Sequence, residues 1–325
     1  MRQPRRHWTH RFFGPLYGYL YQYHLLPADQ TRCEVQFASA LCGLKRKCVL
    51  DLAAGFGRHA RLLARSNQVW ALDQNRAYLA MAREKLSPRT LKNLRTIQAD
   101  MRALPFRDQV FDAVLLLFNS FGYFTSAPPL ERELRQRELW RLPAVFYERG
   151  LVPEDFGVWR EEGGSTPPQQ KRAEESAGGV GAVLQGQGDV TTTSTTQDEN
   201  FLILEEVARV LRSEGDFLLE VPNPRPLLAA VAEAPRRWLV TNDFEIEEEY
   251  TYDRTRALLS NVTRFSVPGR TEWADYHIRL YSRRELEVAL RGAGFKICGV
   301  YGSYAGERYD ASRSPTILLH ARRKR

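Results

Sequence analysis

Apolar residues are spaced as in strands and then as in helices, in regular alternation, between residues 48 and 117. Runs rich in β-branched residues recur there, and segments with helical spacing of apolar positions separate them. The pattern predicts strands at 48–53, 68–72, 94–98 and 111–117, with helices at 58–65 and 75–86. Because these strands are almost wholly apolar, we expect a parallel sheet covered by helices on both faces.

The same alternation returns near the end of the chain. Residues 200–215 have an amphipathic pattern closed by Gly215, and an apolar strand is expected at 216–224. Three antiparallel strands are expected within 244–281, followed by a helix at 282–291 and strands at 295–301 and 315–321. The expected fold is therefore α/β, with an added antiparallel region.

Two segments depart from this pattern. Residues 1–44 contain a helical, aromatic-rich stretch at 10–43, which fits either a helix packed on the domain or a lid over a ligand. Residues 126–198 interrupt the alternation, and 161–198 are rich in Gly, Ser, Thr, Gln and Pro. Such a composition buries too little apolar surface to offset its ordering entropy, so 161–198 is expected to be disordered. The predicted domain thus comprises 45–125 and 199–325.

The net charge of +8 is concentrated at the two ends of the chain. Segments 1–11 and 322–325 hold eight basic residues and no acidic one, so residues 12–321 are neutral overall. A basic face across the domain is not indicated, and we do not expect nucleic acid as a partner. The alternative is that the basic tails are attracted to RNA or to anionic lipid.

The cysteines and the hydropathy pattern exclude further classes. Cys33, Cys42, Cys48 and Cys298 form no CxxC pair and no cluster with histidine, which predicts neither a metal site nor a disulfide framework. A cytoplasmic protein is the simplest expectation. No apolar run of about 18 residues occurs, so no membrane span is expected. Nothing in the sequence indicates the oligomeric state.

A glycine-rich turn follows the first strand of the alternation. In VLDLAAGFGRHA, residues 49–60, the strand ends near Asp51, Gly55 and Gly57 follow, and Arg58 begins a helix. Such a turn exposes backbone N–H groups and lets a ligand approach the main chain closely. The spacing also fits a dinucleotide fingerprint, so the turn alone does not select one ligand.

Polar residues end the next three strands as well. Asp73 lies 18 residues after Gly55 and could accept hydrogen bonds from both hydroxyls of a ribose. Asp100 could accept the amino group of adenine, with Met101 supplying a backbone N–H and an apolar wall. Asn119 follows the fourth strand. A nicotinamide enzyme has less need of an acid at position 100, which favours a different adenosine-containing ligand.

Four linked motifs carry a resemblance to a known family. VLDLAAGFGRHA, VWALDQN, QADMRALPF and FDAVLLLFNSFGYF resemble the successive motifs of the class I S-adenosylmethionine-dependent methyltransferases, and the C-terminal part is similar to their small-molecule type. The resemblance implies a Rossmann-like sheet of seven strands, the last one antiparallel. It also implies S-adenosyl-L-methionine as cofactor, held by Asp51, Ala53, Gly55, Gly57, Arg58, Asp73, Gln74, Asp100, Met101 and Asn119.

The chemistry implied is an in-line displacement at a sulfonium carbon, with N or O of a small molecule as acceptor. The leaving group is neutral, so a base is useful only when the nucleophile arrives protonated. Tyr123, His277 and Tyr304 are the candidates for the acceptor side. The Asp/Asn-Pro-Pro-Tyr signature of enzymes that methylate amino groups of nucleobases or glutamine is absent, and Asn119-Ser120-Phe121-Gly122-Tyr123 stands in its place.

Three alternatives stay open at this point. The first is an NAD(P)-dependent oxidoreductase on a similar sheet, weakened by the absence of a Tyr-x-x-x-Lys pair. The second is an RNA methyltransferase recruited by the basic termini. The third is a binding module that keeps the donor pocket without catalysis.

Overall fold

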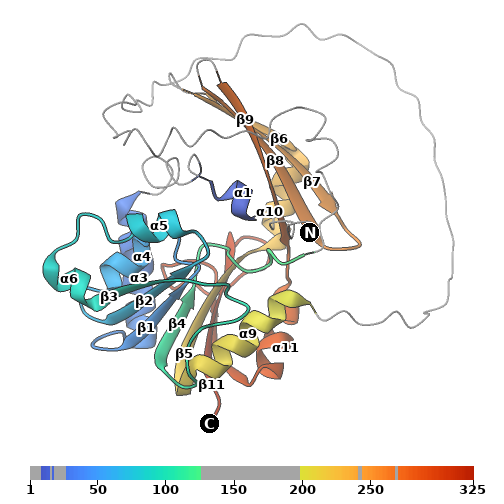
Figure 1. Cartoon of the computed structure of the whole chain (residues 1–325). Helices are drawn as coiled ribbons and strands as arrows, with labels where there is room; N and C mark the ends of the chain where they lie inside the picture. Colours follow the sequence, from blue (N-terminus) through green and yellow to red (C-terminus); the bar gives the residue numbers. More distant parts are fainter. Residues whose placement is uncertain (1–8, 15–16, 18–26, 126–197, 241–243, 268–269) are drawn as a thin grey trace, which may run out of the picture.

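The computed structural model describes residues 9–14, 17, 27–125, 198–240, 244–267 and 270–325 (Figure 1). The predicted insertion and its low-complexity part therefore lie outside the described residues, apart from Asp198. Within the described residues the chain forms two sheets, one of seven strands and one of four.

The seven-stranded sheet has the order β10-β11-β5-β4-β1-β2-β3. Neighbouring strands among β3, β2, β1, β4 and β5 are parallel, whereas β11 is antiparallel to both β5 and β10. This confirms the expected Rossmann-like sheet with an antiparallel last strand. Its strands are β1 Cys48–Leu52, β2 Gln68–Asp73, β3 Leu94–Gln98, β4 Phe111–Leu116, β5 Leu211–Pro222, β10 Phe295–Tyr301 and β11 Thr316–Arg323.

Helices cover both faces of this sheet, as the apolar strands predict. On one face, Ala38 of α3 and Leu63 of α4 pack in a core with Val49. On the other, Ile203 of α9 and Leu286 of α11 pack in a second core, and Figure 1 shows α9 and α11 together on that side. The helices are α3 Ala28–Cys42, α4 Arg58–Leu63, α5 Arg76–Met81, α6 Pro88–Asn93, α9 Glu199–Val210 and α11 Arg283–Gly292; α1 is the short turn Thr9–Phe12.

The second sheet is an antiparallel meander in the order β6-β7-β8-β9. The three expected strands are β7 Glu245–Asp253, β8 Leu258–Val267 and β9 Arg270–Arg279. An additional edge strand, β6 Arg236–Val240, and the preceding helix α10 Pro224–Glu233 were not predicted. Val231 of α10 packs against Leu259 and Ile278, so the helix covers one face of this sheet.

The boundary between α9 and β5 differs from the prediction. The helix ends at Val210 rather than Gly215, and Leu211 already pairs with Phe111 of β4. The register then shifts, because Ala113 pairs with Asp216, so the intervening residues form a bulge within β5. The glycine therefore belongs to a strand irregularity and does not cap the helix. Helix α5 is also shorter than the predicted 75–86.

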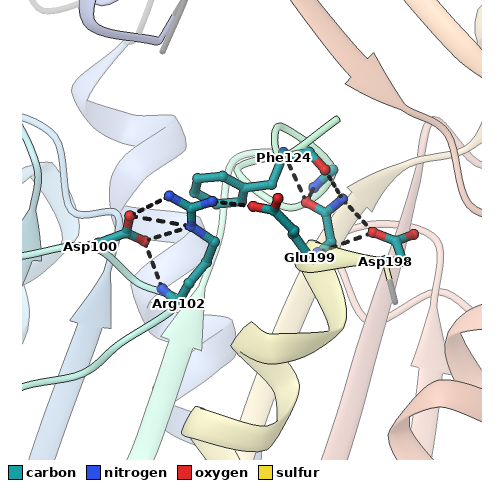
Figure 2. Close-up of polar contacts among 7 residues, drawn as sticks. Asp100, Arg102, Phe124, Asp198 and Glu199 are labelled. Atoms are coloured by element: carbon teal, nitrogen blue, oxygen red, sulfur yellow. Dashed lines mark hydrogen bonds and ion pairs between the residues drawn. The ribbon is translucent and has the colours of Figure 1, made fainter. Parts of the chain in front are cut away.

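The two chain segments that flank residues 126–197 are held together by Asn200. Its Oδ1 accepts hydrogen bonds from the backbone N–H groups of Gly122 (3.2 Å) and Phe124 (3.1 Å). Its Nδ2 donates to the Phe124 carbonyl (2.9 Å) and to Asp198 Oδ1 (2.8 Å). Asn200 is fully buried. Figure 2 shows Phe124 and Asp198 brought together in this way.

Of the helices in the described part of the chain, none has the length and apolar character needed to cross a bilayer.

Candidate cofactor and acceptor site

A cavity opens at the carboxyl ends of β1, β2, β3 and β4, where ligands bind in open α/β sheets. The β1–α4 turn supplies one wall, and the segments after β2, β3 and β4 supply the others. The short N-terminal segment adds Thr9, Phe13 and Tyr17. The described lining residues are Thr9, Phe13, Tyr17, Asp51, Ala53, Ala54, Gly55, Phe56, Arg58, His59, Leu72, Asp73, Gln74, Tyr78, Ala99, Asp100, Met101, Leu117, Phe118, Ser120, Tyr123 and Phe124.

The β1–α4 turn has a left-handed backbone at three positions. Ala53 and Gly55 both have φ of 55°, and Gly57 has φ of 75°. A Cβ at Gly57 would lie 2.5 Å from the Cβ of Ala82, so this glycine allows the start of α4 to pack against the end of α5. Gly57 is not among the described lining residues. Its expected role in ligand binding is therefore indirect, whereas Ala53 and Gly55 face the cavity.

Asp73 at the end of β2 is fixed by backbone donors. Its Oδ2 accepts from the N–H of Gly55 at 2.8 Å, and its Oδ1 accepts from the N–H of Asn75 at 2.8 Å. Burial raises the pKa of Asp73, although these two N–H groups oppose the shift. The carboxylate thus connects the glycine turn to the end of β2 and keeps one lone pair on each oxygen for a ligand.

Asp51 at the end of β1 is only 2% exposed, and its Oδ2 has no hydrogen-bond partner among the described residues. Burial raises the pKa of Asp51, while the charges of His59 and Arg58 oppose that shift. An unpaired buried polar atom costs about 1–3 kcal/mol. This carboxyl is therefore prepared to accept a hydrogen bond or a positive charge from a ligand.

Arg58 and His59 hold a second buried carboxyl, that of Glu34 on α3. His59 Nε2 lies 2.7 Å from Glu34 Oε2, and Arg58 forms an ion pair with the same oxygen. Burial raises the pKa of Glu34, but the hydrogen bond and charge of His59 and the charge of Arg58 reverse this, so the net shift is downward. Arg58 Nη2 is buried with no hydrogen-bond partner among the described residues. Both Arg58 and His59 line the cavity, as expected for Arg58.

Asp100 is paired within the protein, which its sequence position did not indicate. Figure 2 shows the Arg102 guanidinium between Asp100 and Glu199, stacked over the ring of Phe124. Arg102 Nη2 lies 2.7 Å from Asp100 Oδ2, its Nε lies 3.1 Å from Asp100 Oδ1, and its guanidinium carbon is 4.0 Å from the Phe124 ring centroid. The hydrogen bond that Arg102 donates to Asp100 raises the pKa of Arg102. Arg102 therefore orients the acid expected to recognise adenine.

Tyr304 lies behind the cavity wall. Its hydroxyl donates to Glu220 Oε2 at 2.6 Å, and the same oxygen accepts from the backbone N–H of Phe118 at 2.6 Å. Burial raises the pKa values of both Tyr304 and Glu220. Phe118 and Asn119 have positive φ angles of 62° and 58°. Neither Tyr304 nor Asn119 is among the described lining residues, so Tyr304 supports the loop after β4 from behind.

His277 lies in the second sheet and is 2% exposed. Its Nδ1 is 2.8 Å from Ser260 Oγ, and its Nε2 is 3.1 Å from Asp275 Oδ2. It is not among the described lining residues, so its role as a base stays a prediction. Tyr123, by contrast, lines the cavity, with its ring centroid 5.5 Å from that of Phe13.

One cluster of possible metal ligands lies away from this cavity. Ligand atoms of Cys42, Asp216 and His320 lie within 4.8 Å of one another. Because α3, β5 and β11 contribute one residue each, cysteine spacing in the sequence could not reveal the cluster. His320 and Arg322 already contact Asp216 Oδ1 at 2.8 and 3.0 Å, and burial raises the pKa of the Cys42 thiol to about 12. An ion-pair network accounts for the arrangement.

Comparison with known proteins agrees with the fold. The sequence model of a family described as "Methyltransferase domain" matches residues 49–137, which include the first four strands and the glycine turn. The structure is similar to the CcbJ methyltransferase from Streptomyces caelestis, with a TM-score of 0.65 and 16% identity, over 97% of this chain and 98% of that one. Residues 49–137 are therefore similar to a methyltransferase domain, and the fold is that of this solved methyltransferase.

Other methyltransferases are similar to this chain in structure or over part of the sequence. An S-adenosylmethionine-dependent methyltransferase from Clostridium acetobutylicum has a TM-score of 0.62 and 13% identity, over 97% of this chain and 99% of that one. A ubiquinone/menaquinone biosynthesis C-methyltransferase, UbiE, from Marinomonas sp. is 37% identical over 76 residues, 22% of this chain and 30% of that protein. The chain thus spans about a third of the length of the curated relatives it matches. The likeness to the solved structures confirms the expected fold.

Proposed function

We propose that this protein transfers a methyl group from S-adenosyl-L-methionine to a small molecule. The observation that carries the proposal is the buried Asp51 carboxyl, whose Oδ2 has no described partner, beside Asp73 at the neighbouring strand end. Together they form an acidic wall for a cationic, ribose-bearing ligand. A sulfonium donor with an amino-acid end matches that chemistry.

The residues at the carboxyl edge of the sheet would hold the donor. Asp51, the backbone of Ala53 and Gly55, and Arg58, whose Nη2 has no described hydrogen-bond partner, would hold its amino-acid end. Asp73, beside Gln74, would accept from the ribose hydroxyls. Met101 and the Asp100 carboxylate that Arg102 orients would bind the adenine.

The acceptor lies on the aromatic side of the same cavity. Phe13, Tyr17, Tyr123 and Phe124 line that side, and aromatic rings exclude water around the transferred methyl. A solved structure with a similar fold supports a small-molecule acceptor. It is the sugar N-methyltransferase KedS8 from Streptoalloteichus sp., with a TM-score of 0.54 and 13% identity over 100% of this chain and 96% of that one. The acceptor atom is N or O.

The reaction is an in-line displacement in which the acceptor lone pair attacks the methyl carbon while the C–S bond breaks. The sulfonium leaves as a neutral thioether, so no acid is required. An acceptor that arrives protonated loses its proton to a base or to water. Most of the rate comes from holding nucleophile and methyl group in line, which the walls of the cavity do.

The test is calorimetric titration with S-adenosylmethionine and with its demethylated product. We expect both to bind, and we expect Asp73→Ala to weaken binding about 10- to 100-fold, because a charge-assisted hydrogen bond contributes about 1.5–3 kcal/mol. Asp108→Ala is the matched control, since Asp108 is exposed and pairs with Arg209 on the surface. Binding of NAD without binding of the methyl donor would instead support the oxidoreductase alternative.

A further inference from the structure

A second cavity lies beside the first one, between α3, the start of α4 and the segment that joins α5 to α6. Its volume is about 530 Å³. Phe56 and Arg58 line both cavities, so the two are neighbours across the glycine turn. We call the second cavity the basic cleft. Its described lining residues are Ala28, Thr31, Arg32, Phe56, Arg58, Arg61, Leu62, Arg65, Lys85, Leu86, Ser87 and Thr90.

Five of these residues are basic and none is acidic. Arg58 is paired with Glu34, and Arg61 Nη2 donates to the backbone carbonyl of Glu84 at 2.9 Å. The other three, Arg32, Arg65 and Lys85, are exposed, and none of them forms an ion pair with a carboxylate in the described part of the chain. Unpaired like charges around one hollow repel each other, and a bound anion removes that repulsion.

Hydroxyl groups complete the lining. Thr31 Oγ1 accepts from Arg58 Nη1 at 3.1 Å, which leaves its own proton for a ligand. Ser87 Oγ and Thr90 Oγ1 are 2.9 Å apart at the start of α6. Guanidinium groups with hydroxyl donors are the combination by which proteins recognise phosphate, because a planar guanidinium can bind two phosphate oxygens at once.

The charge is local to this part of the chain. Residues 27–98 hold thirteen Lys and Arg against five Asp and Glu, whereas residues 199–325 hold twenty against nineteen. Two of those five acids, Glu34 and Asp51, are buried and do not offset surface charge. The overall neutrality of residues 12–321 therefore hides one concentrated basic region.

We propose that the basic cleft binds a small molecule that carries two or more phosphate groups. A compact polyanion fits a confined hollow with its cations on several sides, whereas a nucleic-acid strand needs a basic track that continues along the surface. The described lining of the cleft does not include Tyr123 or the other aromatic residues of the acceptor side, so this ligand is distinct from the methyl acceptor. Arg58 belongs to both cavities, and occupancy of the cleft therefore alters how tightly the first cavity holds its ligand.

The direct test is calorimetric titration with inorganic pyrophosphate at constant ionic strength, without methyl donor. The cleft variant is Arg32→Gln/Arg65→Gln/Lys85→Gln. The matched control is Arg254→Gln/Arg284→Gln/Lys296→Gln, which removes the same charges from exposed positions outside the cleft. We expect the unsubstituted protein and the control to bind alike, and the cleft variant to bind about tenfold more weakly or worse.

Thermal unfolding without pyrophosphate checks that the cleft variant folds. We expect its melting temperature to equal or exceed that of the control, because the substitutions relieve repulsion between neighbouring cations. Equal pyrophosphate binding by both variants, or no binding beyond that of chloride, would overturn the proposal. A different result would also overturn it: the unsubstituted protein binds an RNA oligonucleotide but not pyrophosphate, and the cleft variant loses the RNA binding. The cleft would then be part of a nucleic-acid surface.

The coupling through Arg58 has its own readout. Pyrophosphate should change the dissociation constant of the methyl donor, and the donor should change that of pyrophosphate by the same factor. Equal donor affinity with and without pyrophosphate would refute the coupling. Pyrophosphate binding in the absence of donor does not depend on methyl transfer, so this result and the test of the proposed function fail separately.

Discussion

The two sheets of this protein differ in where their buried polar groups lie. In β1, β2 and β4 of the seven-stranded sheet, the middle positions are apolar and mostly buried, and the acids Asp51 and Asp73 lie at or next to the strand ends. The outer strands β5 and β11 of the same sheet do bury Asp216, Glu220 and His320. In the four-stranded sheet, polar side chains are buried within the strands themselves. They are Ser260, Asn261, Thr263, Asp275 and His277.

This difference shows which residues stabilise the fold and which residues form the candidate site. A parallel sheet covered on both faces favours apolar strands, so the interior of β1, β2 and β4 stabilises the fold and their carboxyl ends carry the candidate site. In the second sheet, buried polar residues lie in the middle of the strands. Asn261 is fully buried, and its Nδ2, like Asp51 Oδ2 in β1, has no hydrogen-bond partner among the described residues.

The largest expected effect tests this separation in the cores. Phe111 is fully buried and packs edge-on against Phe106 and Trp70, with ring centroids 4.8 and 5.5 Å away. Phe111→Ala should lower the free energy of unfolding by about 3–5 kcal/mol, and its counterpart Phe265→Ala in the second sheet by less than half of that. Phe265 packs in a small cluster with Ile246. Urea unfolding measures both, and equal losses would contradict the contrast.

Turnover should separate the two sheets next. Tyr123→Ala at the edge of the first sheet should lower turnover about 100-fold and leave donor affinity within about threefold, because the ring contacts the acceptor side. Tyr304→Ala should also lower turnover, through the loop that Glu220 and Tyr304 support.

His277→Ala tests the second sheet, and loss of the acidic limb of the pH–rate profile would assign the base to His277. Full activity in all three variants would place the acceptor elsewhere.

Proton release on donor binding is a smaller effect. Burial raises the pKa values of Asp51 and Asp73, so the free protein binds protons there at pH values above the ordinary range of a carboxyl. A cationic donor needs both carboxylates, so it should expel those protons and lose up to about tenfold in affinity per protonated carboxyl for each pH unit below its raised pKa. The same shift makes the free protein less stable as pH rises through that window.

Calorimetry in two buffers of different ionisation enthalpy measures the release. Asp51→Asn should release fewer protons than the unsubstituted protein. Glu248→Gln is the control in the second sheet, because burial raises the pKa of Glu248 as well but the residue does not line the described cavity. An observed enthalpy that is independent of buffer would rule out the coupled titration.

The smallest effect concerns the free edge of the second sheet. Val240 in β6 is 72% exposed and Trp238 is 58% exposed. Val240→Thr should change the free energy of unfolding by less than about 0.5 kcal/mol, as should the control Val288→Thr on α11, which is similarly exposed. A large loss at Val240 alone, with a melting temperature that rises with protein concentration, would mean that a second copy covers this edge.

Local pattern was enough to predict the first sheet and to place Asp51, Asp73 and Asp100 at the strand ends that line the cavity. Within a long α/β alternation, apolar runs such as AVLLLF predict buried parallel strands. The acids that follow these strands therefore lie at the same edge of the sheet. Helix α10 had a local signal too, since Asn223 caps it and Pro224 is its first residue, but the strand expected at 216–224 extends over both residues. Strand β6 has no such signal, because most of its residues are exposed.

The residues that the sequence could not place depend on contacts between distant segments. Gly57 and Gly55 look equivalent in the motif, and only the position of Ala82 decides that one packs while the other faces the cavity. Tyr304 was expected at the acceptor, yet Glu220 holds it behind the wall. Phe124 and Glu199 are distant from Arg102 in the sequence, and only the folded structure brings them into contact with it. The sequence alone therefore did not show that Arg102 orients Asp100.

The hydrogen bonds of the buried Asn200 side chain affect which insertions and exchanges of segments this chain can tolerate. Because one buried amide fixes both Phe124 and Asp198, any segment that joins them begins and ends at one point on the surface of the sheet. Closing a longer loop between fixed ends costs little additional entropy. A reporter domain can therefore be grafted between them, or the natural segment exchanged, while β4 and β5 keep their pairing. Because of Asn200, the fold can accept insertions between Phe124 and Asp198.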